Sequence, residues 1–197
     1  MPASAVEERY STVAVVLHWL IALAIIANIA LGLTFADMSN SDPAKFPLAQ
    51  LHKSIGLTVL LLSLARVVWR LIHPVPPLPA GMSAPLRLAA HISHFLLYFL
   101  IIAIPLTGWA LVSSSPLGLP TIYFGWFAWP DLPYFSDLPR AAKKMWTHEF
   151  AATHVFLAWS AIVVVTIHLA AAFYHHFVRR DVVLARMLPP LRKAEKA

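Results

Sequence analysis

Four long apolar segments limit what this chain can fold into more than any other feature of its sequence. They lie at about residues 12–35, 50–71, 91–112 and 147–177. An α-helix needs about 20 mostly apolar residues to cross the hydrocarbon core of a bilayer, and each segment is long enough. Hydrophobic residues make up 59% of the 197 residues and charged residues 12%, which leaves little chain for a water-exposed domain. We therefore predict an all-α fold, an integral membrane four-helix bundle that forms a single domain over residues 1–197.

The lack of cysteine excludes several kinds of site. The chain has no cysteine and ten histidines, so disulfides, iron–sulfur clusters, cysteine-based zinc sites and covalently attached c-type haem are ruled out. The net charge of +6 is compatible with a nucleic acid partner, but the basic residues flank the apolar segments and form no polar domain. The expected partner is therefore the lipid bilayer, and no nucleic acid is expected.

The basic residues are distributed unevenly between the two sides of the predicted bundle. Four spans place both termini and the second connection on one side. Ten lysines and arginines fall on that side: Arg9, Arg66, Arg70, Arg87, Arg179, Arg180, Arg186, Arg192, Lys193 and Lys196. Five fall on the other side: Lys45, Lys53, Arg140, Lys143 and Lys144. Because cytoplasmic loops carry an excess of Lys and Arg, we predict that both termini are cytoplasmic.

Histidines occur inside the apolar segments at two depths. In the fourth segment His154 lies towards the outer side and His168 towards the cytoplasm, fourteen residues apart. Fourteen residues span about 21 Å of helix and fall about 40° short of whole turns, so both imidazoles point roughly the same way. His18 in the first segment matches the inner level, and His52 in the second matches the outer level. The sequence therefore predicts two histidine pairs, stacked across the bilayer.

Facing imidazoles of this kind suit the axial positions of b-type haem. We predict two non-covalently bound haems b, with His18 and His168 on the inner iron and His52 and His154 on the outer iron. Two protein ligands leave no open position on the iron for small-molecule chemistry, so the predicted task is electron transfer. Ionisable residues inside a membrane segment are functional candidates in any case.

Other histidines compete with these ligands, because depth alone does not make the pairs unique. His148 competes with His154 on the outer side, and His91 and His94 compete with His18 on the inner side. A histidine in a membrane helix can also act only as a hydrogen-bonding partner of a neighbouring helix. Three more lie at span ends, where an interfacial position is expected: His73, His175 and His176. A transporter or metal channel with histidine ligands stays open as a further class of function.

Three basic residues lie close to the predicted haem levels. Arg66 and Arg70 are four residues apart, so their side chains share one helix face and could bind the propionates of the inner haem. Lys53 directly follows His52 and could bind a propionate of the outer haem. The alternative for the arginines is that they extend to the interface as topology signals. Asn28, in the middle of the first segment, is expected to hydrogen-bond a neighbouring helix.

Several short motifs in a fixed order resemble the bacterial cytochrome b561 family. They are LHWL around His18, LHKSIGL around His52, AHISHFLLYFLIIAIPLTG, and IHLAAAFYHHF followed by RRD and RMLP. The resemblance implies a four-helix protein of the bacterial inner membrane that binds two haems b. Its ligand pattern falls on four residues of this chain: His18, His52, His154 and His168. The family's spacing of fourteen residues between the ligands of the fourth span argues against His148.

The resemblance also limits the function. Some members of the family are similar to superoxide oxidases, which pass electrons from superoxide outside the membrane to ubiquinone. Related cytochrome b subunits take electrons from hydrogenases or formate dehydrogenases. We therefore predict electron transfer between a periplasmic donor, with superoxide as a candidate, and ubiquinone. The five basic residues of the outer side would attract an anionic donor. The alternative is a membrane anchor and electron conduit for a partner enzyme; a homo-oligomer stays open, and no catalytic residue is identified.

Overall fold

Four long helices dominate the structure, a computed structural model that describes residues 9–78 and 81–188. They are α1 (Thr12–Asp37), α2 (Lys45–Ile72), α3 (Ala84–Ser113) and α5 (Arg140–Phe173). Each is long and apolar enough to cross a membrane, which confirms the predicted four-helix membrane bundle. α2, α3 and α5 begin before the predicted spans, because the apolar segments mark only the part of each helix suited to hydrocarbon.

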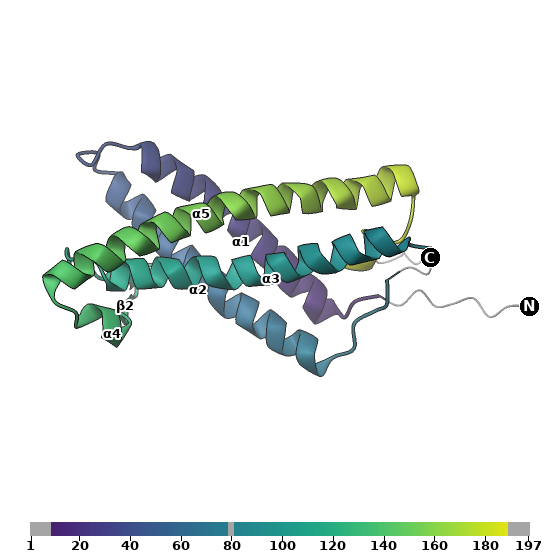
Figure 1. Cartoon of the computed structure of the whole chain (residues 1–197), viewed down its shortest axis with the longest axis horizontal. Coiled ribbons are helices and arrows are strands. Elements are labelled where there is room, and N and C mark those ends of the chain that lie inside the picture. Colours follow the sequence, from purple (N-terminus) through teal and green to yellow (C-terminus); the bar gives the residue numbers. More distant parts are fainter. Residues whose placement is uncertain (1–8, 79–80, 189–197) are drawn as a thin grey trace, which may run out of the picture.

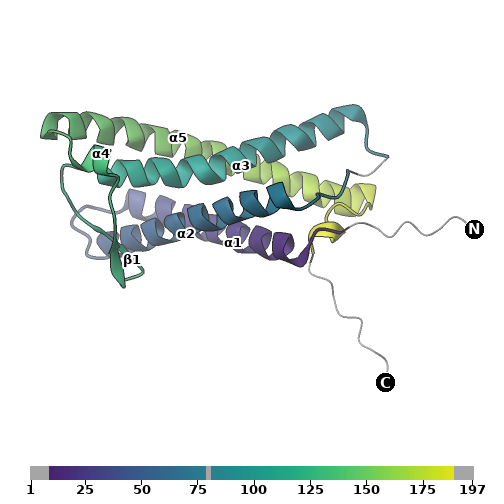
Figure 2. The same cartoon turned by 90° about the horizontal axis from the view of Figure 1, so that it is seen from below.

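The helices form two layers of two (Figures 1 and 2). α1 packs against α2 and α3 packs against α5, while contacts between α2 and α3 join the layers. The first turn of α1 and the last turn of α5 lie at the same end of the bundle, here named the terminal end. The opposite end, which carries the connections after α1 and α3, is named the loop end. That the terminal end faces the cytoplasm stays a prediction, and Arg192, Lys193 and Lys196 lie outside the described residues.

Many large apolar side chains on the helices are exposed. Leu23 on α1, Val68 on α2, Phe99 on α3 and Val163 on α5 are each more than half exposed. The few fully buried apolar residues, such as Leu60, lie between the helices. In a membrane these exposed apolar side chains would contact lipid and not water. This distribution therefore agrees with a membrane protein.

The connection from α3 to α5 contains a short β-hairpin that the sequence analysis did not predict. β1 (Thr121–Tyr123) pairs antiparallel with β2 (Phe127–Trp129). The turn between them has positive φ at Phe124, 47°, and at Gly125, 78°, and Trp126 N donates to Tyr123 O at 2.9 Å. A short helix, α4 (Pro133–Ser136), follows before α5.

The chain after α5 folds back across the terminal end. α5 continues into a π-helix, η1 (Tyr174–Arg179), and a 3₁₀ turn, η2 (Ala185–Met187), follows. Trp19 Nε1 donates to Met187 O at 2.7 Å, and an Arg9 nitrogen donates to Ala185 O at 2.7 Å. These bonds hold the C-terminal segment against the first turns of α1.

Candidate functional site

The first candidate site lies near the loop end, between the two layers. It is formed by His52 of α2 and His154 of α5, whose ring centroids are 6.1 Å apart with an interplanar angle of 76°. Both side chains are half-buried. The predicted outer pair is therefore brought together from opposite layers of the bundle.

The imidazole of His52 is held by the neighbouring helix α1. Its Nδ1 lies 3.0 Å from Asn28 O, and a carbonyl can only accept, so Nδ1 carries the proton. Gly32 lies one turn further along α1, and a Cβ there would stand 3.1 Å from His52 Cε1. A glycine at this position therefore lets the two helices bring the ring and the carbonyl together.

The imidazole of His154 is held in the same way by α3. Its Nδ1 lies 3.0 Å from Ile104 O and 3.2 Å from the hydroxyl of Thr107. Gly108 again lies one turn beyond the carbonyl residue, and a Cβ there would stand 3.1 Å from His154 Cε1. In both rings Nδ1–H is engaged by a carbonyl, which leaves the lone pair of Nε2 for a metal and fixes the plane of the ring.

The second candidate site lies towards the terminal end and contains three histidines. His18 of α1 and His168 of α5 have ring centroids 6.3 Å apart, and His94 of α3 lies 5.7 Å from His168. His18 and His168 are half-buried, whereas His94 is exposed. The structure therefore places His94, the rival identified in the sequence, beside the predicted inner pair.

The distances within these pairs can be compared with what haem requires. A metal–imidazole nitrogen bond is about 2 Å long, so two imidazoles on opposite sides of one ion have ring centres roughly 6 Å apart. The pairs have centroid separations of 6.1 Å and 6.3 Å. Together with the ring orientation at the loop end, these separations fit bis-histidine ligation of haem at both levels.

Two arginines of α2 lie next to the terminal-end histidines. Arg66 donates from Nε to the hydroxyl of Tyr98 at 3.2 Å and from a terminal nitrogen to Ala14 O at 3.1 Å. The Arg70 guanidinium lies 5.5 Å from the centre of the Tyr98 ring. Within residues 9–78 and 81–188 neither arginine has a carboxylate in salt-bridge range. Their charges are therefore free to interact with an anionic group, as haem propionates would require.

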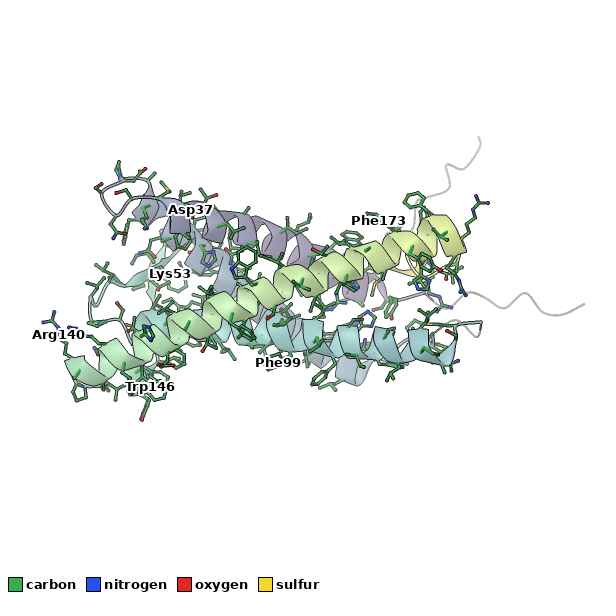
Figure 3. The ribbon with its side chains drawn as sticks, turned by 45° about the horizontal axis from the view of Figure 1, so that its top comes forward. Asp37, Lys53, Phe99, Arg140, Trp146 and Phe173 are labelled. Atoms are coloured by element: carbon green, nitrogen blue, oxygen red, sulfur yellow. The ribbon has the colours of Figure 1, made fainter. Side chains whose placement is uncertain are left out.

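The basic residues of the loop end do not all have the same surroundings. Lys53 lies towards the loop end, as do Asp37 and Arg140 (Figure 3), and is close enough to Asp131 for the two charges to interact. Lys45 is already bound within the turn after α1, where its Nζ donates to Met38 O at 2.8 Å. Lys45 is thus bound by a neutral acceptor, whereas Lys53 is near a carboxylate that offsets its charge.

Three of the other histidines have contacts outside the two pairs. The side chain of His148 is 83% exposed, with its Nδ1 3.6 Å from Glu149. His73 stacks on Trp69 with ring centroids 3.7 Å apart, and His175 Nδ1 donates to Asp181 at 2.6 Å.

Asn28 contributes to the loop-end site through its backbone carbonyl, whereas its side-chain Oδ1 is buried with no hydrogen-bond partner in the described part of the chain. The expected side-chain bond of Asn28 to another helix is thus not made by Oδ1.

The residues that sequence reasoning missed follow one spacing. Each long helix carries one site residue per level, fourteen positions apart: His18 and Gly32, His52 and Arg66, His94 and Gly108, His154 and His168. Fourteen residues are close to four turns of helix, so the same face meets both levels. This spacing is the signal in the sequence that could have identified the two glycines, but only the structure shows which ring each one contacts.

Comparisons with known proteins identify the family of this chain. The family model for prokaryotic cytochrome b561 matches residues 9–190. Cytochrome b561 homolog 2 of Escherichia coli (strain K12) is 39% identical over 183 residues, which cover 92% of each chain. The probable superoxide oxidase CybB of Yersinia pestis is 27% identical over 190 residues, 94% of this chain and 99% of the relative. Cytochrome b562 of Cereibacter sphaeroides is 28% identical over 189 residues, 93% and 98% of the two chains.

These matches extend over nearly the whole chain and include all four long helices. This chain therefore belongs to the prokaryotic cytochrome b561 family, whose members are multi-pass proteins of the bacterial inner membrane that transfer electrons by means of b-type haem.

Proposed function

We propose that the chain binds two haems b and transfers electrons across the inner membrane from superoxide to ubiquinone. The observation that carries this proposal is the stacking of two facing imidazole pairs, His52 with His154 and His18 with His168, along one helix. Haem iron with two imidazole ligands supplies reversible one-electron chemistry and has no open position for a substrate. The protein contributes the ligands, their orientation and the charges around them.

His18 is assigned as the partner of His168 in preference to His94. Both imidazoles lie at a suitable distance from His168, but His94 is exposed whereas His18 is half-buried. An axial ligand is better shielded from its surroundings than a residue at the rim of the site. The ligand pattern of the cytochrome b561 family also falls on His18.

A cavity at the terminal end supports ubiquinone as the acceptor. It has a volume of about 330 Å³ and is lined mostly by apolar residues of α1. Its polar lining includes Arg9, Tyr10 and Arg186, and Trp19 is part of its wall. The Trp19 ring lies 5.4 Å from the His18 ring. Small-molecule sites are typically apolar with a few convergent polar groups, which suits a quinone head group close to the inner ligand.

Superoxide as the donor is supported by the probable superoxide oxidase among the relatives and by the basic residues of the loop end. Two superoxide anions give two molecules of oxygen and two electrons, and ubiquinone takes up two electrons and two protons to form ubiquinol. Residues such as Lys53 would raise the encounter rate with an anion, by about 10-fold or more for a cluster of one sign, and salt would reduce the gain.

The test is ubiquinol formation by the haem-loaded protein in liposomes that contain ubiquinone, with superoxide generated outside. We expect quinol in a ratio of one per two superoxide anions, with a rate that falls as ionic strength rises. A His52→Ala variant that has lost one haem should form none. Haem-loaded wild-type protein that produces no quinol would contradict superoxide oxidation and favour the alternative, an electron conduit for a partner enzyme that should then co-purify.

A further inference from the structure

The β-hairpin between α3 and α5 has a position that the proposed electron transfer does not explain. Residues 116–130, PLGLPTIYFGWFAWP, contain no charged side chain. The hairpin crosses the loop-end half of α2, and its tip projects sideways from the helical layers (Figure 2). A charge-free, aromatic hairpin at the side of a membrane bundle raises the question of what surrounds its tip.

A row of polar residues on one face of α2 binds the hairpin. The row consists of Gln50, Ser54 and Thr58, spaced four residues apart and therefore on one helix face. Gln50 Nε2 donates to Pro120 O at 2.9 Å, and Gln50 Oε1 accepts from Ile122 N at 3.3 Å. Ser54 Oγ accepts from Phe124 N at 3.0 Å and donates to Ile122 O at 3.3 Å. The hydroxyl of Thr58 bonds to that of Tyr123 at 2.9 Å. The row therefore occupies backbone groups along the edge of β1.

This row lies inside the membrane-spanning part of α2. Ser54 and Thr58 are two and six residues closer to the terminal end than His52, which places them about 3 and 9 Å deeper along the helix. His52 itself packs against Gly32, five residues before the loop end of α1 at Asp37. The hairpin therefore crosses α2 at the level of the loop-end site, below the ends of the neighbouring helices.

The same face of α2 continues as a lipid-facing surface. Seven and fourteen residues beyond Ser54 stand Leu61, 46% exposed, and Val68, 56% exposed. The tip of the hairpin is similarly uncovered, since Trp126 is 80% exposed, Phe127 50% and Phe124 41%. The aromatic tip of the hairpin and this side of α2 are thus both apolar and exposed.

From these observations we infer that residues 119–130 form a membrane-embedded hairpin whose tip contacts phospholipid of the leaflet on the loop-end side. Backbone at membrane depth is stable only where its polar groups are satisfied, and the polar row on α2 satisfies groups on β1 while β2 satisfies others. Aromatic side chains at the tip suit the boundary between head groups and acyl chains. The inference does not depend on the haem ligands or on the electron donor.

Site-directed spin labelling in liposomes tests this inference, because the chain has no cysteine and needs no background removed. Nitroxides are placed at Trp126→Cys and, in case that variant fails to fold, at Phe127→Cys. The controls are Val163→Cys, on the exposed side of α5, and Ser41→Cys, in the turn at the loop end. Collision with oxygen, which concentrates in lipid, is compared with collision with a water-soluble nickel chelate.

We expect the oxygen-to-nickel ratio at the tip to be severalfold higher than at residue 41 and to approach the ratio at residue 163. A ratio equal to that of residue 41 would mean that the tip is in water and would overturn the inference. Low collision with both reagents would mean that protein covers the tip, as in a dimer interface, and would also overturn it.

A second variant tests whether the polar row anchors the hairpin. Ser54→Ala removes the acceptor of Phe124 N, so the label at residue 126 should become more mobile and more accessible to the nickel chelate. The matched control is Ser160→Ala, because the hydroxyl of Ser160 bonds only to Phe156 O of its own helix in the described structure. An unchanged label in Ser54→Ala would contradict the anchoring role.

Discussion

His52 and His154 at the loop end have equivalent surroundings, although they belong to different layers of the bundle. Each imidazole donates from Nδ1 to a carbonyl of the adjacent helix at 3.0 Å, and each packs against a glycine one turn beyond that carbonyl. At the terminal end no such equivalence exists. His168 faces both His18 and His94, and on α2 the corresponding position is occupied by Arg66.

The two ends therefore differ in how far the protein itself fixes the proposed haem ligands before haem binds. At the loop end the neighbouring helices fix the orientation and tautomer of His52 and His154, the two proposed ligands. At the terminal end there is a choice of ligand, and a guanidinium without a carboxylate partner in the described residues adds positive charge. A positive charge near haem stabilises its reduced form, which would favour the proposed direction of electron transfer, from the loop end to the terminal end.

The largest expected effect is the loss of one haem at the loop end. His52→Ala should remove that haem and leave much of the other, because α5 is the only helix that supplies a proposed ligand to both haems. The haem-to-protein ratio and the spectrum at low temperature measure this loss. His148→Ala is the control and should retain the full complement. Equal loss of both haems from a folded His52→Ala protein would contradict separate sites.

The next prediction concerns the choice of ligand at the terminal end. His18→Ala should lose the terminal-end haem, whereas His94→Ala should keep it with unchanged low-spin signals in electron paramagnetic resonance. Each variant removes one of the two imidazoles that face His168, so each is the control for the other. Should the outcomes be reversed, His94 would replace His18 as the ligand.

The glycine contacts predict a smaller effect that is confined to the loop end. In Gly32→Ala or Gly108→Ala the new methyl group would stand 3.1 Å from a histidine carbon, so the ring must move by a few tenths of an ångström. We expect altered g-values of the loop-end haem only, with a stability loss of roughly 1–3 kcal/mol from overpacking.

Gly56→Ala is the matched control for these glycines, because its methyl group would stand 3.4 Å from Asn28 Nδ2 and meet no imidazole. Identical spectra in all three variants would show that the close approach of Gly32 and Gly108 is unimportant for the ligands.

The smallest expected effect is a change in midpoint potential when the terminal-end charge is removed. Arg66→Gln should lower the potential of the terminal-end haem by roughly 50–100 mV, the order of magnitude expected when one positive charge near the haem is removed. Redox titration followed by visible spectra measures the shift. Arg70→Gln, at an exposed position, is the comparison and should shift it less. A larger change in the midpoint potential of the loop-end haem would mean that Arg66 acts on that haem, which would contradict this assignment.

The sequence predicted the fold well, because lipid imposes a length and a composition on every crossing segment. The same reasoning gave the depth of each histidine, since depth follows from position along a helix. Depth could not separate His94 from His18, because both lie at one level and differ only in exposure. The roles of Gly32 and Gly108 depend on contacts between helices, which a pattern within one helix does not contain.

The hairpin was missed for a different reason. Strands of only three residues are too short to show the alternation of apolar and polar residues that marks a longer strand. The hairpin is held by side chains of α2, Gln50 and Ser54 above all. Such a partnership between a loop and a distant helix leaves no local signal in the sequence.

Haem stoichiometry tests the central claim most directly. A pyridine haemochrome assay on the purified wild-type chain, with protein measured by amino-acid analysis, should give two haems b per chain, and His168→Ala should give one. One haem in the wild-type protein, or two in a folded His168→Ala variant, would contradict the assignment of two stacked histidine pairs.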